Sequence, residues 1–117
     1  MTEKTNPRML KVWREAHLQS VRSHDLDLTS RQMSVLLSVY MTEPPHTVRG
    51  LATELNVTKP VITRALDTMG QMGLVKRKRD EKDKRSVLIQ RTVKGAVYLS
   101  ELSDRIMNAD KSVTDDD

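Results

Sequence analysis

Basic side chains are concentrated in one short stretch of this chain, from residue 76 to residue 94. The stretch holds nine lysines and arginines against three acidic residues, a local charge of +6, whereas the rest of the chain carries −2 of the net charge of +4. Positive charge of this density attracts phosphates and releases counterions on binding. We therefore expect a nucleic-acid-binding surface here, with a merely solvated loop as the alternative.

Two short helices over residues 47–72 are predicted just before this stretch. Apolar residues recur at helical spacing after Thr47, whose hydroxyl can cap a helix, and Asn56 marks the break. A second helix is predicted from Thr58. Ala52, Asn56 and Ile62 have the small, turn and apolar characters that let two helices cross closely, which indicates a helix-turn-helix.

The predicted second helix separates an apolar face from a polar one. The apolar positions follow three- and four-residue spacing and are Ile62, Ala65, Leu66 and Met69. The polar face is free to enter a major groove, where Arg64 is the candidate for a bidentate contact to guanine. Thr58 and Lys59 suit phosphate contacts. An ion pair of Arg64 with Asp67 or Glu54 is the alternative.

A β-hairpin is predicted over residues 74–91. Its strands, Leu74–Lys78 and Ser86–Arg91, flank a charged tip without apolar residues. Val87 and Ile89 alternate with more exposable neighbours, as a sheet with one buried face requires. A hairpin after a helix-turn-helix is a wing. The expected fold is therefore mainly α with a small β-hairpin wing (α+β), a winged helix-turn-helix.

Five short motifs occur in order along the chain: Leu28-Thr29-Ser30-Arg31-Gln32, Leu51-Ala52-Thr53-Glu54-Leu55, Gly73-Leu74-Val75, Asp83-Lys84-Arg85 and Thr92-Val93-Lys94-Gly95. In the first, Thr29 and Gln32 also form a capping box. With these motifs the chain resembles the MarR family of winged-helix transcription regulators from about Leu28 to Gly95. The resemblance implies a sequence-specific regulator that binds double-stranded DNA, with repression as the family default.

The resemblance also assigns DNA contacts to particular residues. It implies that the arginine of Asp83-x-Arg85 reaches into the minor groove while the aspartate orients its guanidinium. Arg77 and Arg79 are alternative groove probes, and solubility is the alternative role of Asp83. The expected DNA contacts are Thr47, Arg49, Thr58, Lys59, Pro60, Thr63, Arg64, Arg77, Arg79, Lys82, Asp83, Lys84 and Arg85.

Two outer helices, expected over residues 8–23 and 93–108, carry apolar surfaces larger than a small core can cover. The resemblance implies a homodimer formed by these helices, with packing within one chain as the alternative. The candidate interface residues are Met9, Trp13, Leu99, Leu102 and Ile106. The chain departs from the family by ending soon after the first C-terminal helix. Arg91 also replaces the usual leucine before Thr92, which questions the strand-to-helix junction and offers another phosphate contact.

Ligand binding is less defined. Many members of the family bind small phenolic or lipophilic acids, and the candidate contacts here are Trp13, His17, His24, Arg31 and Tyr40. The small-molecule effector stays unidentified, and a regulator without a ligand is the alternative. His17 is more typical of a packed histidine than of a ligand contact. His24 and Asp27 resemble a metal cluster only weakly, so neither metal nor cofactor is expected.

Composition limits the remaining function classes. With 117 residues, 37% apolar content and no cysteine, the chain fits one domain without thiol chemistry. We expect this domain over residues 8–109, between a flexible N-terminus (1–7) and an acidic flexible tail (110–117). A polar start without a signal peptide predicts a cytoplasmic protein. No catalytic motif indicates an enzyme, so the alternative function is a protein-interaction module or co-regulator that binds a partner through its apolar outer helices.

Overall fold

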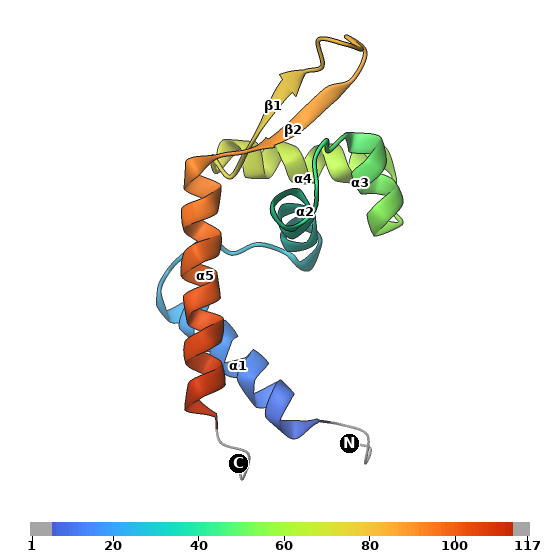
Figure 1. The fold of residues 1–117 in the computed structure, drawn as a ribbon. Helices are drawn as coiled ribbons and strands as arrows, with labels where there is room; N and C mark the ends of the chain where they lie inside the picture. The colour runs from blue at the N-terminus through green and yellow to red at the C-terminus, as the bar shows by residue number, and fades with distance from the viewer. Residues whose placement is uncertain (1–5, 114–117) are drawn as a thin grey trace. The chain divides into compact units, whose positions relative to one another are not determined.

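The computed structural model describes residues 6–113, in which five α-helices accompany a two-stranded antiparallel sheet (Figure 1). In chain order these are α1 (Pro7–Arg22), α2 (Ser30–Met41), α3 (Val48–Leu55), α4 (Lys59–Gln71), β1 (Val75–Arg79), β2 (Val87–Arg91) and α5 (Val93–Ser112). This mainly helical arrangement with one β-hairpin is the fold class expected from the sequence. Within the described range, no helix is both long and apolar enough to cross a membrane.

The chain divides into two compact units, and the expected single domain over residues 8–109 stays a prediction. One unit is Leu28–Tyr98, which contains α2, α3, α4, the hairpin and the start of α5. The other comprises α1 and the rest of α5 among the described residues. The helix-turn-helix and the wing therefore belong to a single unit.

Local capping places the helices of the Leu28–Tyr98 unit. The predicted capping box of α2 is confirmed, because Thr29 Oγ1 accepts from Gln32 N at 3.1 Å and Gln32 Oε1 accepts from Thr29 N at 2.9 Å. Thr47 caps α3 by accepting from Gly50 N at 3.0 Å. Asn56 ends α3 with a left-handed φ of 56°, which asparagine tolerates better than most residues. These signals fix the turn between α3 and α4.

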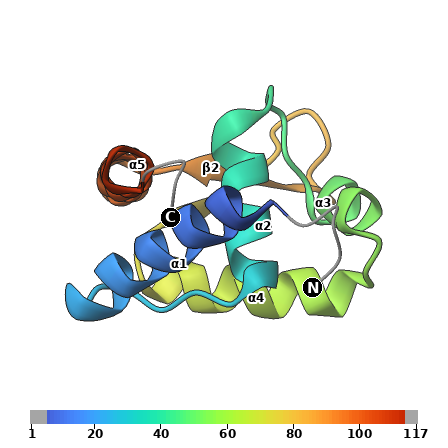
Figure 2. The same ribbon diagram turned by 90° about the horizontal axis from the view of Figure 1, so that it is seen from below.

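The core of this unit is aliphatic, as the composition requires. The four predicted apolar positions of α4 are all buried. Figure 2 shows α2 crossing α4, with α3 beside the N-terminal end of α4. Their shared core includes Val35, Leu36, Val39, Leu51, Ile62, Leu66, Met69, Leu74 and Ile89.

The hairpin is anchored at its base and extends away from the helices (Figure 1). β1 pairs with β2 so that Val75 lies opposite Arg91 and Arg77 opposite Ile89. Ile89 is 3% exposed but Val87 is 38% exposed, because Val87 lies nearer to the tip, opposite Arg79. The expectation that both residues of this alternation are buried is therefore wrong at Val87.

Tyr40 ties α2 to both ends of the hairpin. Its buried hydroxyl donates to Leu74 O, just before β1, at 2.7 Å and accepts from Thr92 N, just after β2, at 2.8 Å. Thr92 Oγ1 in turn donates to Gly73 O at 2.7 Å and accepts from Gly95 N at 2.9 Å. The Tyr40 hydroxyl is therefore engaged in hydrogen bonds within the protein, and a contact of Tyr40 with an effector stays a prediction.

Arg91 reinforces the same junction. Its Nε donates to Val39 O and its Nη2 to Thr42 O, each at 2.9 Å. A cation at a helix C-terminus satisfies carbonyls that lack partners within the helix and complements the helix dipole. The expected phosphate contact of Arg91 is thus corrected, since its guanidinium caps α2 and secures the strand-to-helix junction.

Two ion pairs join the N-terminal part of the chain to the part of α5 that follows Tyr98. Arg8 Nη2 lies 2.6 Å from Asp110 Oδ1, and Arg105 Nη2 lies 3.1 Å from Asp25 Oδ2. Asp110 is helical, so α5 continues to Ser112 instead of ending near Asn108. At the other end, α1 already starts at Pro7 after its cap Asn6. The last part of the expected tail, residues 114–117, and residues 1–5 lie outside the described residues.

We expect Gly95→Ala to destabilise the fold by about 2 kcal/mol, a typical cost of overpacking. A Cβ at Gly95 would overlap Tyr40 Oη and Leu74 O, so the junction would have to open. Urea unfolding followed by circular dichroism at one fixed protein concentration measures the change. Gly70→Ala is the matched control, because nothing lies within 4 Å of a Cβ there; we expect it to be neutral or stabilising by about 0.5 kcal/mol.

Candidate nucleic-acid interface

The outer face of α4 is polar and exposed. Lys59, Pro60, Thr63 and Arg64 lie on this face, opposite the buried apolar positions of the same helix. Thr58 occupies the N-cap position, but its side chain makes no capping hydrogen bond. The hydroxyl therefore remains available to a ligand.

Arg64 is free of the ion pairs considered as its alternative. Asp67 instead pairs with Arg77, and Glu54 accepts a hydrogen bond from Ser38 Oγ at 2.9 Å. Arg64 lines an open groove of about 190 Å³ between α2 and α4, together with Arg31. Its guanidinium thus stands exposed on the same face as Thr63.

The start of α3 is joined to the wing. Thr47 forms an isolated antiparallel bridge with Leu88, and Ile89 N donates to His46 O at 2.9 Å. Thr47 Oγ1 is engaged in capping, whereas Arg49 is exposed in the first turn of α3. Of these two expected DNA contacts, the Thr47 hydroxyl is engaged within the protein, whereas Arg49 is exposed.

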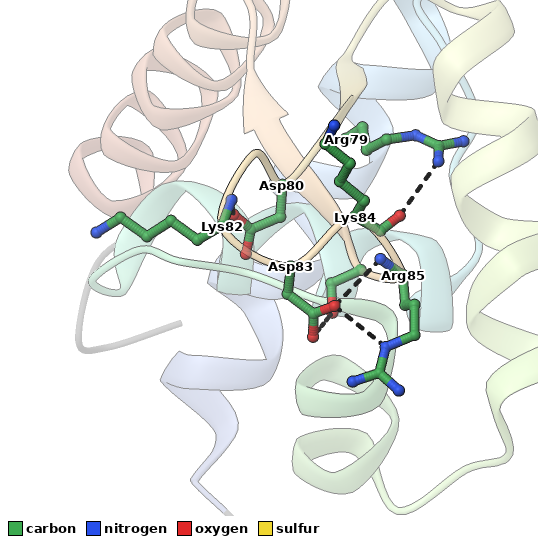
Figure 3. A network of polar contacts seen from close by, with 7 residues as sticks. Arg79, Asp80, Lys82, Asp83, Lys84 and Arg85 are labelled. Atoms are coloured by element: carbon green, nitrogen blue, oxygen red, sulfur yellow. Dashed lines mark hydrogen bonds and ion pairs between the residues drawn. The ribbon is translucent and has the colours of Figure 1, made fainter.

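The arginines of β1 have partners within the protein. Arg77 Nη2 donates to Asp67 Oδ1 at 2.7 Å and to Thr63 O at 3.2 Å, both in α4. Arg79 Nη1 donates to Lys84 O at 3.2 Å and so bridges the tip of the wing (Figure 3). Both residues considered as alternative groove probes are thus held by the framework.

Arg85 is an exposed arginine of the tip. Its side chain is 93% exposed, and its Nε lies 3.3 Å from Asp83 Oδ1, which also accepts from Arg85 N at 3.1 Å (Figure 3). One carboxylate therefore orders both the backbone and the guanidinium of Arg85. Asp80 plays a similar backbone role by accepting from Lys82 N at 2.9 Å, while the Lys82 side chain extends away from the tip (Figure 3).

The outer helices expose apolar side chains. Trp13 is 63% exposed, Met9 48% and Ile106 42%, whereas Leu99 and Leu102 are half-buried. Leu10, Val21 and Met107 are exposed as well, and the sequence analysis missed them. Leu10 could have been identified from the sequence, because it directly follows the candidate Met9 on α1.

Two of the candidate effector contacts, Trp13 and His17, lie against each other on α1. His17 is exposed instead of packed; its Nδ1 lies 2.8 Å from Trp13 O, and the two rings are in contact at 4.3 Å. Asp25, which follows His24 in the sequence, forms an ion pair with Arg105. Among residues 6–113, no three His, Cys, Asp or Glu side chains lie close enough together to hold a metal ion.

Comparison with known proteins agrees with this geometry. The MarR family model matches residues 28–87, more than half of the chain. The transcriptional regulator Tm0710 from Thermotoga maritima is 24% identical with a TM-score of 0.71, covering 86% of this chain and 68% of that one.

Two further similar structures contain DNA. The transcriptional repressor CouR bound to a 23-mer DNA duplex is 26% identical with a TM-score of 0.70, covering 88% of this chain and 70% of that one. The MepR–DNA complex of S. aureus is 23% identical with a TM-score of 0.71, covering 90% and 84%. With the family model spanning most of the helix-turn-helix unit, this chain belongs to the MarR family of winged-helix transcription regulators.

Proposed function

We propose that this protein is a repressor that binds double-stranded DNA sequence-specifically, with α4 in the major groove and the wing in the minor groove. The observation that carries this proposal is the outer face of α4, where Arg64 is exposed and its two potential intramolecular partners are engaged elsewhere. A free guanidinium on a helix of this kind can form a bidentate contact with guanine.

The wing would supply the contacts to the DNA backbone and the minor groove. Lys76, Lys78, Lys82 and Lys84 are exposed, so their ammonium groups can neutralise phosphates. A narrow minor groove concentrates negative potential and favours one well-oriented guanidinium. Arg85, held by Asp83 and almost fully exposed, suits that role better than Arg77 or Arg79.

Repression and dimerisation complete the proposal. CouR is a transcriptional repressor with DNA bound, which supports both repression and duplex binding by this chain. The exposed Trp13, Met9 and Ile106 support a homodimer through the outer helices. Such a dimer would present two copies of α4 to half-sites about one helical turn apart, and so would select an inverted repeat.

Selection of duplexes from a random library at near-physiological salt tests sequence specificity. We expect wild type to enrich an inverted repeat, and Arg64→Ala to lose preference at one base pair of each half-site, worth about 1–3 kcal/mol. Lys59→Ala is the control, since loss of a phosphate contact should weaken binding to all sequences alike. If wild type enriched no sequence, specific DNA binding would be wrong, and the protein-interaction alternative would be favoured.

The wing is tested by the affinity of Arg85→Ala for the enriched site. We expect a loss of about 10- to 100-fold per half-site, as for one charge-assisted hydrogen bond. Asp83→Ala should also weaken binding, although it removes a negative charge, because it frees the guanidinium. Titrations at several salt concentrations measure both. Tighter binding by Asp83→Ala would contradict the orienting role of this carboxylate.

The dimer is tested by sedimentation velocity over a range of protein concentrations. We expect Trp13→Asp to raise the dimer dissociation constant by about 100-fold or more, because a buried tryptophan at an interface is a typical hot spot. Arg14→Asp introduces a negative charge at the neighbouring, exposed position of α1 and changes the net charge more, yet it should have a smaller effect. If the two variants had the same dimer dissociation constant, or if wild type were monomeric, this interface would be ruled out.

A further inference from the structure

One face of the hairpin carries three arginines that all bond to the protein itself. Residues opposite each other in an antiparallel pair share a face, so the register places Val75, Arg77 and Arg79 with Val87, Ile89 and Arg91. Arg91 caps α2, Arg79 closes the wing tip and Arg77 reaches α4. Lys76 and Lys78 lie on the other face, and their side chains have no hydrogen bond or ion pair with the described residues.

Arg77 contacts α4 at the part that would read DNA. One nitrogen, Nη2, donates both to the carbonyl of Thr63 and to the carboxylate of Asp67 one turn later. Thr63 is one of the exposed residues on the outer face of α4. The guanidinium of Arg77 therefore holds the backbone of the helix and leaves its outer side chains uncovered.

This contact fixes a direction that apolar packing alone does not. Leu74 and Val75 are buried at the base of the wing, but apolar contacts are non-directional and tolerate small rotations. A double hydrogen bond from a planar guanidinium constrains both distance and orientation. It links β1, which leads to the tip with Arg85, to the helix that carries Arg64.

We infer that Arg77 is a positioning residue, which aligns α4 with the wing so that Arg64 and Arg85 enter adjacent grooves together. This inference rests on the proposed function. It differs from the expectation that Arg77 binds DNA directly, because the guanidinium acts through Asp67 and Thr63. The specificity of binding then depends on a carboxylate, Asp67, that touches no DNA.

The two roles predict opposite effects for Asp67→Ala. If Arg77 contacts phosphate, removing a nearby negative charge should tighten binding to every duplex. If Arg77 positions α4, the same variant should weaken binding to the selected site while leaving or improving binding to a random duplex. We expect about fivefold loss per half-site at the selected site, the upper range for a partly exposed ion pair.

Glu81→Ala is the matched control for charge. Glu81 is exposed at the wing tip and forms no ion pair or hydrogen bond with the described residues. Its removal changes the net charge by the same amount without touching Arg77. We expect Glu81→Ala to bind the selected and the random duplex equally well or more tightly, so that the ratio of the two affinities stays that of wild type.

The variants of Arg77 add a salt dependence and a coupling test. Arg77→Ala should lower the affinity ratio but leave the salt slope unchanged, whereas a lost phosphate contact reduces the slope by about 0.9. Lys78→Ala, one residue along β1, should show the phosphate pattern. The double variant Asp67→Ala/Arg77→Ala should lose no more specificity than either single variant, because both remove the same link.

All titrations are made at a temperature where circular dichroism shows each variant fully folded, so that lost stability is not read as lost specificity. A wild-type protein that selects no sequence would overturn the proposed function itself. A wild type that selects a site, combined with an Asp67→Ala variant that behaves like Glu81→Ala, would overturn only the positioning role of Arg77.

Discussion

The hydroxyl of Tyr40 is the contact on which the geometry of the winged unit depends. A buried hydroxyl without partners is costly, so this one must keep both its donor and its acceptor bonds. Its two partners, the carbonyl of Leu74 and the amide of Thr92, lie on either side of the hairpin. Together with Arg91, this side chain fixes the base of the wing relative to α2, and Gly95 leaves the space that Tyr40 needs.

The basic residues around this anchor divide into two groups. The arginines on the face of the hairpin that carries Val75 and Ile89 donate to backbone carbonyls and to one carboxylate. A planar group with several donors suits this role. Lysines on the opposite face of the hairpin and at its tip are exposed to solvent; these are Lys76, Lys78, Lys82 and Lys84. Of the nine basic residues between positions 76 and 94, three arginines are thus engaged within the protein, whereas the Arg85 side chain at the tip is 93% exposed.

Much of this organisation is readable from local sequence. The capping box of α2, the apolar spacing of α4 and the charged tip between two strands each involve residues a few positions apart. Local patterns of this kind determine which segments form helices and strands, and the mainly aliphatic core follows from the composition. The structure extends α5 beyond its predicted end near Asn108, to Ser112, and Asp110 in the last turn pairs with Arg8, 102 positions away.

The order of elements, the exposed face of α4 and the charge of the wing can therefore be predicted from the sequence, since these depend on periodicity and local charge. Which arginines are engaged depends on how distant segments pack. Arg91 meets Val39 across 52 positions and Arg77 meets Asp67 across 10, and no local pattern records such a pairing. Strand alternation places Arg77 on the same face as Val75, but the carboxylate that receives it is defined only once α4 packs against β1.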